Sequence, residues 1–127
     1  MNTIMDNRVR HNFRELNVWK EGMSLCRLIV TMTKSFPEHE KFSLVSQMNR
    51  ASISIPSNIA EGCARKSNKV FVNFLEIALG SAYELETQLV ICSELNYFDG
   101  ETYAVIYDKI NKIQRMLFNL IETIEEK

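Results

Sequence analysis

Apolar residues recur at alternating steps of three and four through four stretches of this chain, the spacing of one buried face of an α-helix. The most regular stripe joins Phe71, Leu75, Ala78, Ala82, Leu85, Leu89 and Cys92. The four stripes predict helices over about 17–36, 40–64, 68–95 and 100–125. Short loops between helices are typical of neighbours that run antiparallel.

Residues that favour helix ends separate these stretches. Pro37 ends the first helix, because the residue before a proline is driven out of the α region. Short polar side chains that could cap helix N-termini are Asn17, Ser67 or Asn68, and Asp99. The sequence therefore predicts a single all-α domain over 1–127. We expect an up-down-up-down antiparallel four-helix bundle with left-handed packing, preceded by a flexible tail over 1–14.

The second predicted helix contains a run of small polar residues around its only proline, Pro56. Proline costs about 3 kcal/mol inside a helix, so we expect a kink there. Polar positions repeat every three or four residues and form a narrow ribbon with Ser57 slightly beyond it: Gln47, Arg50, Ser54, Asn58, Glu61 and Arg65. Small polar side chains suit a close, hydrogen-bonded contact, which favours a subunit interface or a pore lining. The alternative is an ordinary solvated helix face.

The third predicted helix carries a second stripe that is apolar at both ends and polar between them: Phe74, Ile77, Ser81, Glu84, Gln88, Ile91 and Leu95. A helix with two stripes is either central in its own bundle or shared with a neighbouring subunit. The shared interface is favoured, because a four-helix domain needs one buried stripe per helix. Gly80 and Ser81 would let another helix approach closely. Glu84 is a candidate partner for Arg50 or Arg65.

Several motifs resemble those of one protein family. They are Leu16-x-Val18-Trp19, Phe36-Pro37-x-x-Glu40, Gln47-x-x-Arg50-Ala51, the run from Ser54 to Gly62, and Phe74-Leu75-x-Ile77-Ala78-x-Gly80-Ser81-x-x-Glu84-Leu85. Over about 13–121 the chain is similar to the four-helix-bundle proteins first noticed as open reading frames in intervening sequences of bacterial 23S ribosomal RNA genes. The resemblance implies a bacterial homo-oligomer, a pentameric ring. It also implies kinship with the accessory subunits of diversity-generating retroelements, which partner a reverse transcriptase and RNA.

Charge divides the chain into two parts. Residues 41–72 hold five basic residues and one acidic residue, whereas residues 73–127 hold four basic and ten acidic residues. The basic candidates for a nucleic-acid contact are Arg50, Arg65, Lys66 and Lys69. The alternative is an ordinary basic loop, since the net charge is −1. From the resemblance and these basic residues together, we expect a non-enzymatic oligomeric binding or scaffold subunit that associates with RNA or an RNA-associated protein. The alternative is a purely structural or protein–protein interaction module.

No pattern in the sequence points to catalysis, a metal or a cofactor. The two histidines, His11 and His39, lie outside the stripes, and neither Glu-x-x-His nor a phosphate-binding glycine motif occurs. Cys26, Cys63 and Cys92 fall on apolar stripes without a CxxC pair, which is typical of reduced thiols in a cytoplasmic protein. No membrane span is predicted, since no apolar run approaches about 20 residues, and no signal peptide is predicted.

Overall fold

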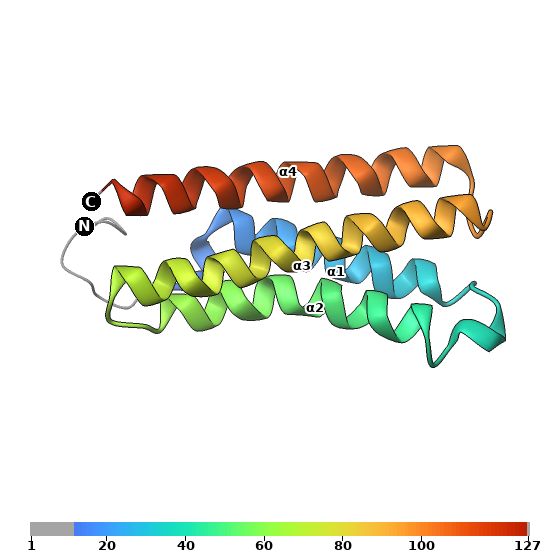
Figure 1. The fold of residues 1–127 in the computed structure, drawn as a ribbon, viewed down its shortest axis with the longest axis horizontal. Coiled ribbons are helices and arrows are strands. Elements are labelled where there is room, and N and C mark those ends of the chain that lie inside the picture. The colour runs from blue at the N-terminus through green and yellow to red at the C-terminus, as the bar shows by residue number, and fades with distance from the viewer. Residues whose placement is uncertain (1–11, 127) are drawn as a thin grey trace.

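The computed structural model describes residues 12–126, and within them every regular element is a helix. The four long helices are α1 (Asn17–Thr33), α2 (Leu44–Cys63), α3 (Asn68–Glu94) and α4 (Gly100–Glu125). Two short 3-10 helices, η1 (Phe13–Glu15) and η2 (Glu38–Glu40), precede α1 and α2. Successive long helices run antiparallel along one axis (Figure 1), so the predicted four-helix bundle is confirmed.

The predicted apolar stripes form the core of this bundle. All seven stripe residues of α3 are buried, and they share one core cluster with fully buried side chains of the other helices, such as Leu25, Ile55 and Ile110. Burying a side chain of this size contributes about 1.5–3 kcal/mol. Four residues on the stripes of the other helices are only half-buried: Met32, Val45, Tyr103 and Leu120.

Two glycines allow the helices to approach closely. A Cβ atom on Gly62 would lie 2.8 Å from Cδ1 of Phe71, so α3 begins directly against the last turn of α2. A Cβ atom on Gly22 of α1 would lie 3.3 Å from Cγ2 of Ile55 and 3.6 Å from Cβ of Pro56. Because Pro56 is buried and α2 continues through it, its ring is a packing surface for α1 rather than a helix end.

The start of the chain and the first connection differ from the sequence prediction. Leu16, and not Asn17, is the N-cap of α1, and it makes no side-chain capping bond. The first helix ends at Thr33 and the second begins at Leu44, because η2 and a turn follow the proline that separates them. Part of the predicted tail is structured, since η1 begins at Phe13. Residues 1–11 of that tail, including His11, lie outside the described residues.

The other predicted caps are confirmed. Ser67 Oγ accepts from the Val70 N–H at 3.1 Å, and Asp99 Oδ1 accepts from the Thr102 N–H at 2.7 Å. The N-cap bond lowers the pKa of the Asp99 carboxyl, because backbone N–H donors favour the charged form.

The end of α3 is closed by a backbone motif centred on Asn96. Asn96 has φ 59°, the left-handed conformation that only Gly and Asn adopt readily. The Tyr97 N–H donates to the Cys92 carbonyl at 3.0 Å, and the Asn96 N–H donates to the Ser93 carbonyl at 3.1 Å. This pair of bonds is a Schellman motif, which satisfies carbonyls that the helix leaves free.

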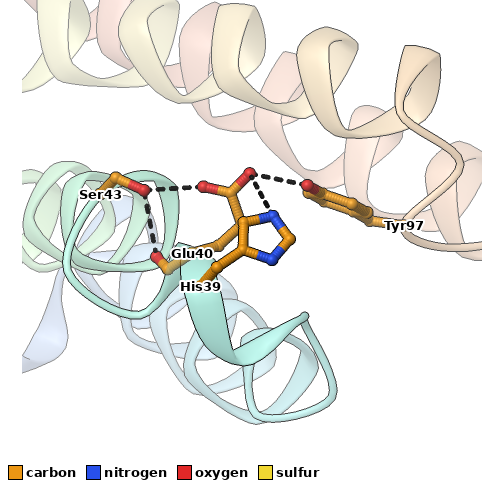
Figure 2. Close-up of polar contacts among 4 residues, drawn as sticks. All are labelled: His39, Glu40, Ser43 and Tyr97. Atoms are coloured by element: carbon orange, nitrogen blue, oxygen red, sulfur yellow. Dashed lines mark hydrogen bonds and ion pairs between the residues drawn. The ribbon is translucent and has the colours of Figure 1, made fainter.

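The same end of the bundle is tied together by side chains from two connections (Figure 2). Tyr97 donates its hydroxyl to Oε2 of Glu40 at 2.6 Å, and Ser43 donates to Oε1 at 2.7 Å. Nε2 of His39 lies 3.7 Å from the same Oε2. The ring of Phe36 packs on that of Tyr97 with centroids 5.1 Å apart. The α1–α2 connection is thereby joined to the turn between α3 and α4.

Candidate functional site on helices α2 and α3

A chain of hydrogen bonds crosses the seam between α2 and α3. Asn58 Nδ2 donates to Ser54 Oγ at 2.9 Å and to the Ser54 carbonyl at 2.8 Å. Ser54 Oγ and Ser81 Oγ are 2.8 Å apart, and Ser81 Oγ donates to the Ile77 carbonyl at 3.1 Å. Since each hydroxyl has one proton, the bonds run in one direction, from Asn58 through Ser54 and Ser81 to Ile77. The small polar side chains therefore join the two helices directly.

Next to this chain lies a polar cavity of about 370 Å³. Five of the predicted site residues line it together with Ala51: Gln47, Arg50, Ser54, Ser81 and Glu84. The structure thus brings together residues that are far apart in sequence. Asn58 adjoins the cavity through Ser54, whereas Ser57 and Glu61 are exposed and do not line it.

The charged groups of this cavity are not paired with each other. No ion pair within 4.0 Å joins Arg50 to Glu84, although both line the cavity. Glu84 instead accepts from Gln88 Nε2 at 3.3 Å. Gln88 is buried, and its Oε1 has no hydrogen-bond partner among residues 12–126. The Arg50 guanidinium and the Gln88 amide oxygen therefore both have capacity for a further partner.

Arg65 finds a nearer partner than the sequence suggested. It pairs with Glu61 at 3.3 Å, one helical turn away, and not with Glu84. Its guanidinium also lies over the Phe74 ring, 4.8 Å from the centroid. Both charged groups are exposed, so the ion pair contributes at most about 0.5 kcal/mol. The spacing of four residues between Glu61 and Arg65 is the sequence feature that predicts this ion pair.

The basic candidates for nucleic-acid contact are spread over the molecule. Arg50 and Arg65 are fifteen residues apart on the α2 side, which corresponds to about 22 Å along a helix. Lys66 is exposed between α2 and α3. Lys69 lines a different cavity, which it shares with Ile124 and Glu125 of α4.

Half-exposed aliphatic side chains run along α3 beside the polar seam. They are Val70, Ile77, Ile91 and Leu95, and their exposed fractions are 38%, 51%, 42% and 48%. Their spacing places them on one side of the helix. We call this surface the α2/α3 face and define it by these four residues, Gly80, and the polar residues Gln47, Arg50, Ser54, Asn58, Glu61, Ser81 and Glu84. The pattern of the second stripe predicted most of it, but only the structure shows which aliphatic residues are exposed.

Gly80 lies on the α2/α3 face with open space around it. A Cβ atom there would meet nothing within 4 Å. Glycine inside a helix costs about 1 kcal/mol relative to alanine. No close approach within residues 12–126 requires glycine at this position.

The described residues offer no arrangement typical of catalysis. Residues 12–126 contain no group of three His, Cys, Asp or Glu side chains that could hold a metal ion. All three cysteines are free, and burial raises the pKa of the Cys92 thiol to about 11. A thiol with this pKa is protonated at neutral pH and therefore a poor nucleophile. Among the described helices, none has the length and apolar character needed to cross a membrane.

The fold and this surface define an all-α four-helix-bundle protein with a polar seam and an adjoining apolar strip. The chain belongs to the 23S rRNA-intervening sequence protein family, whose family model matches residues 14–119. This confirms the family resemblance drawn from the sequence motifs.

A solved structure shares this fold. The chain is similar to a protein of unknown function from the S23 ribosomal protein family of Bacteroides thetaiotaomicron, with 30% sequence identity and a TM-score of 0.77. The similarity covers 82% of this chain and 97% of that chain. No curated protein gives a significant match.

Proposed function

We propose that this protein is a non-enzymatic scaffold subunit that assembles with copies of itself through the α2/α3 face. The observation that carries the proposal is the strip of half-exposed aliphatic side chains along α3. Covering a half-exposed aliphatic side chain contributes about 1 kcal/mol, so four of them supply roughly 4 kcal/mol before the cost of association. A contact of this strength stabilises an assembly when the same contact is repeated between all neighbouring copies of a closed ring.

Two further features of the face support a contact with another helix. Gly80 leaves space for the backbone of another helix to approach. Glycine lowers the stability of α3 at this position, and no contact within the isolated subunit offsets that loss. The polar cavity offers Arg50, which makes no ion pair within residues 12–126, to an acceptor group of a partner. We infer a pentamer from the family resemblance, and light scattering of the purified protein measures the stoichiometry directly. We also place the protein in the cytoplasm, where its three free cysteines would stay reduced.

The experiment that tests self-assembly compares two substitutions of exposed aliphatic residues. Ile77→Glu adds a charge to the α2/α3 face, whereas the control Val105→Glu adds one to a residue of α4 that is 53% exposed and lies off this face. Mass is measured by size exclusion with light scattering, and folding by circular dichroism. We expect Ile77→Glu to be folded and of lower mass than the wild type, and Val105→Glu to keep the wild-type mass. A folded Ile77→Glu variant with unchanged mass would overturn the proposal.

RNA binding is the second candidate function. Lys66 and Lys69 support it, because both are exposed and make no ion pair within residues 12–126. Each phosphate contact adds about 0.9 to the salt dependence of binding, so a few contacts per subunit bind weakly unless assembly multiplies them. The relationship to the accessory subunits of diversity-generating retroelements, which partner RNA, stays a hypothesis that rests on the family resemblance. If the double variant Arg50→Ala/Arg65→Ala binds RNA with an unchanged salt slope, the assignment of these two arginines is wrong.

A further inference from the structure

A second surface adjoins the α2/α3 face on the other side of α3. Two cavities lie between α3 and α4 along this side, one of about 430 Å³ and one of about 250 Å³. The larger lies where α3 begins and α4 ends, lined by Val72, Glu76 and Ile124 among others. The smaller lies further along, between Tyr83 and Phe118. We call the surface that contains both cavities the α3/α4 groove.

The groove exposes aromatic side chains that the fold itself does not use. Tyr83 is 55% exposed and Phe118 is 52% exposed, and Arg115 lines the same cavity. Tyrosine, phenylalanine and arginine are enriched in protein–protein interfaces, where aromatic side chains fill pockets of the partner. The composition of the groove is therefore that of a protein-binding surface.

An unsatisfied acceptor lies at the end of the groove. Asn68 lines the larger cavity, and its Oδ1 is buried without a hydrogen-bond partner among residues 12–126. A buried acceptor without a partner costs about 1–3 kcal/mol. A donor from a molecule seated in the groove would remove that cost.

The α2/α3 face is poorly suited to pair with a second α2/α3 face. A basic corner adjoins this face where α2 ends, and it consists of Lys66 and of Arg65, which pairs with Glu61. Ile91 and Leu95 lie near the opposite end of α3. In a parallel two-fold pair the basic corners of the two copies would be adjacent and repel each other. In an antiparallel pair each basic corner would face the apolar end of the other copy. A surface that is not self-complementary needs a different surface as its partner.

The α3/α4 groove provides the opposite charge at the matching end. Glu76 and Glu125 line the larger cavity together with Lys69, and the exposed Glu122 lies in the same last two turns of α4 as Glu125. Acidic side chains therefore outnumber basic ones at this end of the groove. The end of α4 and the α2–α3 connection lie at the same end of the bundle (Figure 1). When two copies are placed side by side with their helices parallel, the basic corner of one therefore meets the acidic end of the groove on the next.

We propose that the α3/α4 groove receives the α2/α3 face of a second copy, so that the subunits associate head to tail. On α3, Ile77 and Tyr83 are six residues apart and so point about 120° away from each other. Two contact surfaces set at this angle make a row of copies curve, as a closed ring requires. This inference rests on the proposed self-assembly and adds the identity of the second contact surface.

The test mixes two variants that each lack one of the two surfaces. Ile77→Glu disrupts contacts of the α2/α3 face, and Phe118→Glu disrupts contacts of the α3/α4 groove. Tyr83→Arg is a second groove variant in case Phe118→Glu does not fold. Circular dichroism checks folding, and Val105→Glu again controls for added surface charge. Head-to-tail association predicts that each variant alone is monomeric, because every contact needs both surfaces. It also predicts that an equimolar mixture forms a heterodimer through the one intact pair of surfaces.

Other outcomes distinguish the two proposals. If folded groove variants keep the wild-type mass while Ile77→Glu is monomeric, self-assembly stands and the head-to-tail inference is overturned. If both variants are monomeric but the mixture forms no heterodimer, the inference is overturned as well. If Ile77→Glu keeps the wild-type mass, or the wild type is itself a monomer, the proposed self-assembly fails first.

Discussion

The Tyr97 hydroxyl donates to the Glu40 carboxylate across 57 positions of sequence, at a distance of 2.6 Å. This bond and the one from Ser43 hold the pKa of Glu40 below its ordinary value, because both stabilise the charged carboxylate. The same bond raises the pKa of Tyr97, since it is lost when the phenol ionises. The two residues thus link the stability of this end of the bundle to pH.

Removing the Tyr97 hydroxyl should make acid unfolding less pH-dependent. A carboxyl whose pKa is lowered on folding stabilises the folded state above its unfolded pKa, and this contribution is lost as pH falls through the folded pKa. Tyr97→Phe keeps the ring contact with Phe36 and removes the bond. We expect the wild type to melt at a higher temperature near pH 7, with the difference shrinking as the pH is lowered below about 4.5. Thermal melts from pH 7 to pH 3 measure it, and a constant difference would contradict it.

Gly62→Ala should destabilise the subunit by about 1–3 kcal/mol. The new Cβ would lie 2.8 Å from Cδ1 of Phe71 and 3.1 Å from Cβ of Phe74, so the buried Phe71 ring or the helix backbones must shift. Urea unfolding followed by circular dichroism measures the free energy of unfolding. If the variant is as stable as the wild type, the close approach of the two helices at Gly62 is not required.

Gly80→Ala, unlike Gly62→Ala, should increase the stability of a subunit that cannot assemble. Its Cβ meets nothing within 4 Å, so alanine should raise the free energy of unfolding by about 0.5–1 kcal/mol in the Ile77→Glu background. In the otherwise wild-type protein we expect the same change to weaken assembly, because it fills space left for a neighbouring backbone. Sedimentation at several concentrations tests the second effect, and assembly at unchanged affinity would argue against a close contact at Gly80.

The hydrogen-bond chain across the α2/α3 seam should behave as one unit. Ser54→Ala removes the central hydroxyl and leaves Asn58 and Ser81 each without one bond. We expect Ser54→Ala and Ser81→Ala each to cost about 1 kcal/mol. The double variant should cost less than the sum of the two, because residues in contact are not additive. A strictly additive cycle in urea unfolding would mean that the two hydroxyls act independently.

Charge reversal at Glu84 should break the assembly and leave the subunit folded. Glu84 is exposed beside Arg50 in the polar cavity of the α2/α3 face, so an arginine there would bring like charges together. Glu38→Arg in η2 is the control, because Glu38 is also exposed but belongs to the α1–α2 connection, outside both contact surfaces. Elution of Glu84→Arg at the wild-type position on size exclusion would count against this interface.

The stripes and caps explain why so much of the fold was predictable. Core residues such as Leu75 and Leu89 repeat at helical spacing, and Ser67 and Asp99 mark helix starts by local chemistry. The start of α2 was missed because η2 and a turn follow Pro37, and their geometry depends on contacts with the distant Tyr97. Local pattern carries no information on such a contact.

For the candidate site, sequence periodicity grouped the polar residues but not their partners. Ser54 and Ser81 were placed on matching stripes, and their bond follows from the register of two helices that only the structure supplies. The pattern suggests Glu84 on α3 as a candidate partner for Arg65, although Glu61 lies one turn away and forms the ion pair. The aromatic pair Tyr83 and Phe118 was not singled out, because exposure cannot be read from residue type.

Helix α3 carries side chains of both proposed contact surfaces within 27 residues. A helix turns by about 100° per residue, so the angle between two of these side chains is set by the number of residues between them. The angle between Ile77 and Tyr83 depends on the number of residues that separate them, and a substitution at either position leaves it unchanged. The number of subunits in a closed assembly would then depend on this spacing along α3, whereas a substitution on either surface could only weaken or abolish a contact.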